Sequence, residues 1–285
     1  MVVNGVAIGL VYIVLATGLV LILSVTRILY IAYGSLYMIG AFTLWSGIAL
    51  LQLPFLLSLL IATSVTTLLA SASYHILFRH VLRRPKPLLA VVVGAVALMM
   101  VLDQAGILIF GSVPRGLSPL ISGTVDIFGA SISLEKLFIM ATALVIAACL
   151  FYVYEKTDIG RIMRAVAFNA ETASLQGINT NVVNLVTLGI GGALAGIAGG
   201  VMAPAYGVFP AMGGNIILFI MLVVMLGGMD SMAGAVLAGL ICGVTQSVGQ
   251  FFFGGLSQAL VFAVIGVIIY FRPGGLLGSG VQLEV

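Results

Sequence analysis

Charged residues are scarce in this sequence. Only 7% of its 285 residues are Asp, Glu, Lys or Arg, whereas soluble domains contain about 25%. A soluble protein needs a polar surface, and a chain that is 62% hydrophobic cannot supply one. The mean hydropathy of +1.31 therefore indicates that lipid surrounds most of the chain.

Cysteine and histidine are also scarce. Cys149 and Cys242 lie inside apolar runs, and they form neither a disulfide framework nor a metal-ligand pattern. His75 and His80 are too few ligands for a metal centre or a catalytic site, which argues against a membrane-embedded enzyme. The sequence also lacks a G-x-x-x-x-G-K-[ST] phosphate-binding loop. We therefore expect the chain to bind no cofactor or metal of its own.

Alternating apolar and polar segments, which would indicate a β-barrel, are missing. Instead the apolar runs are continuous, and most have about the 20 residues that a spanning helix needs. We predict an all-α, polytopic transmembrane bundle of about eight or nine spans, forming a single domain over residues 1–285. One run is short, Gly214–Gly227, and is predicted to be re-entrant or part of a broken helix. The runs are Gly5–Val25, Ile28–Leu51, Pro54–Leu77, Leu88–Phe110, Leu134–Tyr154, Val182–Ala203, Gly214–Gly227, Met232–Phe252 and Leu256–Phe271.

Positive charges collect in a few short loops. Residues 79–86 contain four basic residues and no acid, so the positive-inside rule places this loop in the cytoplasm. The N-terminus is then outside and the C-terminus cytoplasmic, with nine of the 11 Lys and Arg residues on the cytoplasmic side. Such a bias is an orientation signal and does not indicate nucleic-acid binding. The outside loop Gly111–Ser133 is either an external cap or a plain connector.

Small residues recur every four positions in two of the runs. Gly192, Gly196 and Gly200 form one stripe, and Gly239 and Gly243 belong to another. Lipid gives helices no hydrophobic reason to associate, so close contact depends on such small residues. The stripes predict helix packing, with sliding surfaces as the alternative.

Polar side chains within the runs are few. Asp103 lies inside the fourth run, where a charge is costly, so it should face protein or a water-filled cavity. Asp230 lies in a glycine-rich interruption, GGMDSMAG, and broken helices often mark transport pathways. Either acid is a pathway contact or a structural partner for a helix end.

Three tyrosines stand close together near the start of the second run. Tyr30, Tyr33 and Tyr37 are spaced three and four residues apart, which predicts that they share one helical face. An interfacial aromatic belt is one explanation. With Ser35 between them, a polar and aromatic wall facing a central cavity is the interpretation we favour.

Several segments resemble a known family nearly end to end. The opening segment VNGVAIGLVYIVLATGLVLILSVTRI, which contains Tyr12, is similar to the first helix of the permease subunits of branched-chain amino acid ABC importers. The chain resembles the shorter of their two paralogous types. The most specific match is TDIGRIMRAVAFNAETASLQGIN, residues 157–179. The segments MLGGMDSMAGAVLAGL and FRPGGLLG also match.

The resemblance implies a role for residues 157–179 as a cytoplasmic coupling segment that binds an ATPase subunit. It implies two ATP-binding subunits carrying ATP and Mg, a second paralogous permease, and an extracytoplasmic solute-binding protein. It also implies the bacterial inner membrane. The coupling residues would be Thr157, Gly160, Arg161, Arg164, Glu171, Gly177 and Asn179. The substrate pathway would include Tyr12, Tyr30, Tyr33, Ser35, Tyr37, Asp103 and Asp230.

The chain departs from the family pattern along this pathway. Family members typically have Asn, His and Asp at the positions of Tyr30, Tyr33 and Ser35, and Gly at the position of Asp230. A less polar pathway raises the hypothesis of a more apolar solute, such as an aromatic carboxylate. The alternative to an importer subunit is a stand-alone secondary transporter or channel, which would leave residues 157–179 unexplained.

Overall fold

Helices dominate the computed structural model, which describes residues 2–82, 87–117, 123–127, 130–272 and 274–278. Each of the nine apolar runs folds as a helix, so the predicted all-α, polytopic bundle is confirmed. These helices are α1 (Val2–Thr26), α2 (Tyr33–Ala49), α3 (Phe55–Ser73), α5 (Pro87–Phe110), α6 (Leu134–Lys156), α9 (Thr180–Tyr206), α10 (Met212–Gly227), α11 (Met232–Phe253) and α12 (Ser257–Phe271).

Among the described residues, six helices are long and apolar enough to cross a membrane. They are Val3–Thr26, Phe55–Val81, Leu89–Phe110, Leu134–Lys156, Thr180–Tyr206 and Met232–Phe253. The second of these includes α3, a π-helical turn η1 (Tyr74–Phe78) and α4 (Arg79–Val81). The 16-residue α10 ends at Gly227 and α11 begins at Met232, so the chain is interrupted where the glycine-rich motif predicted a break.

The segment Gly111–Ser133, which the sequence predicts to be an outside loop, contains regular structure that the sequence did not indicate. A hairpin of β1 (Thr124–Ile127) and β2 (Ala130–Ser133) is antiparallel, with Thr124 opposite Ser133. A second short bridge joins the loop to the segment after α9, where the amides and carbonyls of Arg115 and Val208 exchange two hydrogen bonds of 2.8 Å. The described part of Gly111–Ser133 is therefore more than a plain connector.

The chain divides into two compact units. One consists of Met1–Val20, Ile121–Ala147 and Leu218–Val285, and the other of Leu21–Leu120 and Ala148–Ile217. Three of the four boundaries fall inside helices, namely α1, α6 and α10. The prediction of a single domain over the whole chain stays a prediction.

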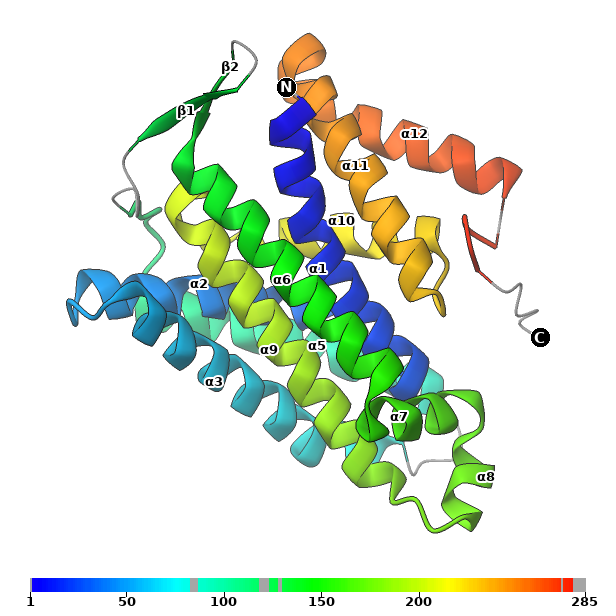
Figure 1. Ribbon diagram of the computed structural model, residues 1–285. Helices are drawn as coiled ribbons and strands as arrows, with labels where there is room; N and C mark the ends of the chain where they lie inside the picture. The colour runs from blue at the N-terminus through cyan, green and yellow to red at the C-terminus, as the bar shows by residue number, and fades with distance from the viewer. Residues whose placement is uncertain (1, 83–86, 118–122, 128–129, 273, 279–285) are drawn as a thin grey trace. The chain divides into compact units, whose positions relative to one another are not determined.

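The second unit is built around α2, α3 and α9, and Figure 1 shows α9 running beside α3. The glycine stripe of α9 makes this packing possible. A Cβ at Gly192 would lie 2.5 Å from the Ala70 Cβ, and one at Gly196 would collide with the Thr66 side chain. A Cβ at Gly200 would lie 2.8 Å from Leu59. The stripe therefore lets α9 approach α3 closely.

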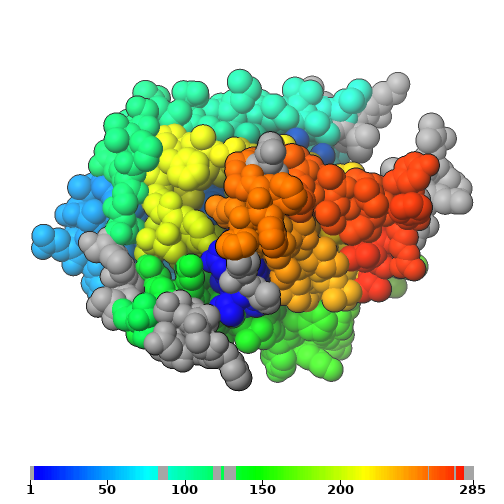
Figure 2. All heavy atoms as spheres, turned by 90° about the horizontal axis from the view of Figure 1, so that it is seen from above, coloured from blue at the N-terminus to red at the C-terminus, as the bar shows by residue number. Residues whose placement is uncertain are grey.

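In the first unit, glycines bring α1 and α11 together. A Cβ at Gly243 would collide with the backbone of Gly9, and one at Gly239 would lie 2.8 Å from the Ile13 side chain. The helix α12 continues from α11 through the short 3-10 turn η2 (Gly254–Leu256). Figure 2 shows α12 and α11 next to one another, in red and orange.

Candidate transport pathway and coupling surface

Residues 157–179 form two short helices, α7 (Asp158–Phe168) and α8 (Ala170–Leu175), between α6 and α9. Polar side chains at the helix starts define these boundaries. The Thr157 hydroxyl accepts the Gly160 amide at 3.2 Å, and the Asn169 side chain accepts the Thr172 amide at 2.9 Å. Asn179 does the same at the start of α9. Such caps satisfy amides that have no partner within the helix.

The helix α7 is anchored to the end of α6. A Cβ at Gly160 would collide with the carbonyl oxygen of Tyr154, so only glycine allows the two helices to meet in this way. The Arg164 guanidinium donates to the carbonyls of Tyr154 and Glu155, the latter at 3.3 Å. It also lies over the Tyr154 ring, 5.2 Å from its centroid. Arg164 therefore holds α7 on α6, in addition to bordering the exposed surface.

The same segment is strongly amphipathic. Gly160, Met163 and Val166 are the buried residues of α7, and Ala173 is the buried residue of α8. The opposite side carries large apolar side chains in the open: Phe168 is 93% exposed and Leu175 is 85% exposed. They are the most exposed large apolar side chains of residues 157–179, and contiguous exposed apolar patches often mark interaction sites.

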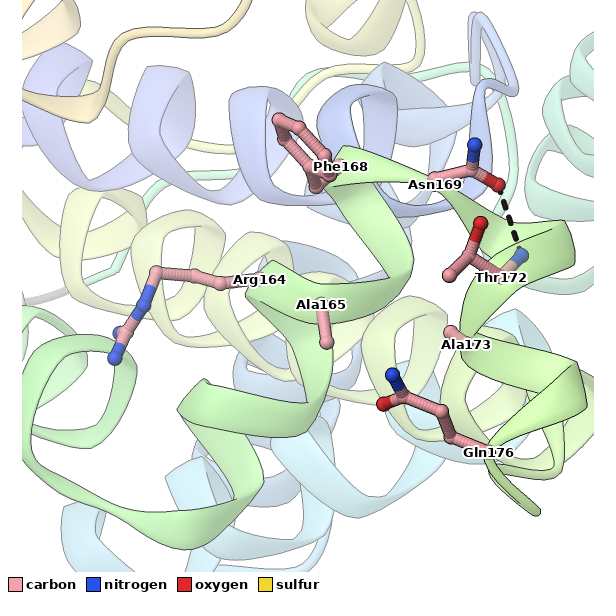
Figure 3. A pocket seen from close by; sticks show the side chains of 7 residues that line it. All are labelled: Arg164, Ala165, Phe168, Asn169, Thr172, Ala173 and Gln176. Carbon is pink, nitrogen blue, oxygen red and sulfur yellow. Dashed lines mark hydrogen bonds between the residues drawn. The ribbon is translucent and has the colours of Figure 1, made fainter.

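A shallow pocket of about 350 Å³ lies between α7 and α8. Figure 3 shows the bend at Asn169 that separates the two helices, with Phe168 directly before it. The pocket is lined by Arg164, Ala165, Phe168, Asn169, Thr172, Ala173 and Gln176. We refer to this pocket and the exposed Leu175 together as the coupling surface, after the role that the sequence predicts for residues 157–179.

The coupling residues expected from the sequence divide into two groups. Thr157, Gly160, Gly177 and Asn179 build caps and turns, and Gly177 has a φ of 87°. Arg161 and Glu171 are exposed, and Arg161 pairs with Asp158 on its own helix. Sequence reasoning missed Phe168 and Leu175, although the α7 periodicity could have located Phe168 away from the buried positions.

The three tyrosines do not share a helical face. Tyr33 and Tyr37 belong to α2, but Tyr30 lies before the helix, in the non-helical linker Arg27–Ala32, so that prediction is wrong for Tyr30. All three side chains are buried. The Tyr30 hydroxyl is 2.9 Å from the Ser73 hydroxyl, whereas the Tyr33 hydroxyl has no hydrogen-bond partner among the described residues.

Asp103 meets the first turn of α2. The fully buried Ser35 hydroxyl donates to Asp103 Oδ1 at 2.6 Å. No basic side chain of the described residues forms an ion pair with Asp103. A hydrogen bond to a carboxylate is stronger than one between neutral groups, so this contact joins α5 to the start of α2.

Two further pathway candidates lie in the other unit. The Tyr12 hydroxyl donates to Gln246 Oε1 at 2.5 Å, and its ring stacks on Phe219 with centroids 6.0 Å apart. Asp230 is exposed in the break between α10 and α11. The structure brings Tyr30, Tyr33, Tyr37, Ser35 and Asp103 into one unit, and Tyr12 and Asp230 into the other.

Metal chemistry finds no support in the described part of the chain. It contains no group of three or more His, Cys, Asp or Glu side chains that could hold a metal ion. His75 and His80 are both exposed.

The sequence profile of a family described as "Branched-chain amino acid transport system / permease component" matches residues 1–272. The chain is 28% identical to the high-affinity branched-chain amino acid transport system permease protein BraD of Pseudomonas aeruginosa, covering 97% of this chain and 94% of the relative. It is 30% identical to the corresponding LivH protein of Salmonella typhimurium and 29% identical to that of Escherichia coli K12, each covering 96% of this chain and 94% of the relative. No solved structure matches the chain.

Proposed function

The chain belongs to the branched-chain amino acid transport system permease family, and from this premise we propose that it forms part of the membrane pathway of an ATP-driven importer for small organic solutes. It is a multi-pass membrane protein and a transport subunit rather than an enzyme. Its substrate class is that of its relatives, the branched-chain amino acids. A more apolar or aromatic carboxylate is the competing substrate.

The observation that carries this proposal is the coupling surface. The chain has no phosphate-binding loop of the G-x-x-x-x-G-K-[ST] type, so energy has to enter from another subunit. The helices α7 and α8 present exposed apolar side chains, and α7 is fixed to α6 by Gly160 and Arg164. An anchored helix with an exposed apolar face is suited to transmit movement from a bound partner subunit. We propose that this partner is an ATP-binding subunit.

The proposed assembly contains two ATP-binding subunits with ATP and Mg, a second, paralogous permease and an extracytoplasmic solute-binding protein. Its location is the bacterial inner membrane, with the N-terminus outside and the C-terminus in the cytoplasm. The distribution of Lys and Arg supports this orientation. Transport would proceed by exchange between outward-open and inward-open states, driven through α7 and α8.

Within the membrane, we assign the solute contacts to the tyrosines, Ser35 and Asp103, with Tyr12 and Asp230 as further pathway residues. The tyrosine rings, which are buried in this structure, would offer apolar surface to a branched or aromatic side chain once the pathway opens, and the Asp103 carboxylate suits an ammonium group. An amino acid fits both features, whereas a substrate with a carboxylate alone would be repelled by Asp103.

Purification of the assembled complex tests the proposal. The double substitution Phe168→Ala with Leu175→Ala removes most of the exposed apolar area of the coupling surface. Central interface residues often contribute about 2 kcal/mol or more, so we expect roughly 30-fold weaker retention of the ATP-binding subunit. Leu108→Ala is the matched control, because Leu108 is 85% exposed but lies on the span α5.

Equal retention of the ATP-binding subunit by both variants would contradict the proposal. Uptake by the isolated chain, with no ATP-binding subunit present, would favour a stand-alone transporter instead.

A further inference from the structure

The linker between α1 and α2 contains a backbone conformation that is unusual for its residue type. Arg27 directly follows α1 and has a φ of 57°, in the left-handed region that side chains other than glycine rarely adopt. Such conformations persist where the surrounding structure imposes them, and they occur often at functional sites. Contacts with neighbouring residues must therefore hold Arg27 in this conformation.

Arg27 contacts the far end of the coupling segment. Its Nη2 donates to the carbonyl oxygen of Ala167 at 3.0 Å, across 140 residues of sequence. Ala167 is the penultimate residue of α7, so its carbonyl oxygen accepts no hydrogen bond from an amide of the same helix. A cation near a helix C-terminus is also favoured by the helix dipole. The contact lies directly beside Phe168 of the coupling surface.

The rest of the linker is tightly organised. The Thr26 hydroxyl accepts the Ile28 amide at 3.2 Å, and the Tyr33 amide donates to the Tyr30 carbonyl at 3.1 Å. Ile28 and Tyr30 are fully buried. These internal contacts restrict the conformations that the linker can adopt.

The other end of the linker leads into the proposed solute pathway. Tyr33 begins α2, and two residues later the Ser35 hydroxyl bonds Asp103. At the same point, a Cβ on Gly34 would collide with the Gly213 carbonyl, so the backbone of α2 has no free space there. The linker therefore joins Arg27 to a closely packed part of α2.

We propose that Arg27 is a positioning residue that connects α7 to α2. Movement imposed on the coupling surface by an ATP-binding subunit would pass through the Arg27–Ala167 contact to the first turn of α2, and so to Ser35 and Asp103. The inference rests on the proposed function, because it requires that α7 and α8 receive force from that subunit.

Substitution of Arg27 separates this role from a structural one. Arg27→Gly removes the guanidinium and relieves the left-handed backbone, since glycine adopts positive φ without cost. Arg27→Asn is a second variant, because asparagine tolerates the same backbone region. Arg27→Lys keeps a cationic donor. All are prepared as the full complex in proteoliposomes with the solute-binding protein, and leucine uptake and ATP hydrolysis are measured together.

We expect Arg27→Gly and Arg27→Asn to retain the ATP-binding subunit and to hydrolyse ATP, while leucine taken up per ATP falls by about fivefold or more, a typical coupling factor between sites. Arg27→Lys should recover most of the ratio. An unchanged ratio in both Arg27→Gly and Arg27→Asn would overturn the proposal, and so would loss of the ATP-binding subunit. If the unmodified chain retains no ATP-binding subunit, the proposed function fails instead.

Discussion

At the scale of single residues, Asp103 has two possible roles, one in solute recognition and one in helix packing. Its carboxylate lies within an apolar helix and receives a hydrogen bond from the buried Ser35 hydroxyl. An intramembrane charge is costly, so the presence of Asp103 indicates either a functional contact or a structural one at the start of α2. The functional explanation requires the negative charge of Asp103, whereas the structural explanation requires only an acceptor for the Ser35 hydroxyl.

Asp103→Asn removes the charge and keeps the size and the acceptor for Ser35. If the carboxylate attracts the ammonium of the solute, leucine uptake should fall about tenfold, which corresponds to about 1.4 kcal/mol. Gln104→Leu, at the exposed neighbouring position, is the control and should leave uptake unchanged. The measurement is the initial rate of uptake in proteoliposomes, with thermal stability recorded alongside.

Unchanged uptake together with a lower melting temperature for Asp103→Asn would assign Asp103 to the structural role. Uptake of an aromatic carboxylate lacking an amine, at a rate equal to that of leucine, would also contradict ammonium recognition.

At the scale of elements, the junction of α6 and α7 depends on one glycine. Gly160→Ala would place a Cβ against the carbonyls of Tyr154 and Val153, which are backbone atoms that cannot rotate away. Overpacking of this kind typically costs about 1–3 kcal/mol. We expect α7 to shift, with loss of ATP-binding subunit retention and a lower melting temperature.

Gly266→Ala in α12 is the matched control, because a Cβ there has nothing within 4 Å. It should leave both quantities unchanged. Wild-type retention of the ATP-binding subunit by Gly160→Ala would show that the α6–α7 junction is not what orients the coupling surface.

Apolar run length predicted the helices well, because membrane helices have to satisfy their own backbone groups. The second run was misjudged at its start. The apolar run begins at Ile28, but α2 begins at Tyr33, after a non-helical linker whose first residue, Arg27, has a left-handed conformation. Apolar residues in the linker, such as Ile28 and Ile31, hide that interruption from any hydropathy pattern.

Contacts between distant segments could not be predicted from one sequence. The Ser35–Asp103 and Arg27–Ala167 hydrogen bonds join residues 68 and 140 positions apart. The acceptor in the Arg27–Ala167 hydrogen bond is a backbone carbonyl, which every residue type has, so the identity of residue 167 does not reveal the contact. By contrast, the caps at Thr157, Asn169 and Asn179 are local, and their residue types alone favour helix starts.

For the whole molecule, function depends on which side of the membrane the coupling surface faces. The two compact units are each held by glycine contacts, α9 with α3 in one and α1 with α11 in the other. The family match extends from residue 1 to residue 272 and so covers both units. As an importer subunit, the chain needs a solute pathway and a cytoplasmic surface that an ATP-binding subunit can contact and move.

Crosslinking from position 168 tests this claim most directly. A photoreactive amino acid replaces Phe168 in the assembled complex within inside-out and right-side-out membrane vesicles. We predict a covalent adduct with the ATP-binding subunit, and protease access to residues 157–179 only in inside-out vesicles. Access from the periplasmic side, or no adduct with an ATP-binding subunit in the intact assembly, would contradict the account.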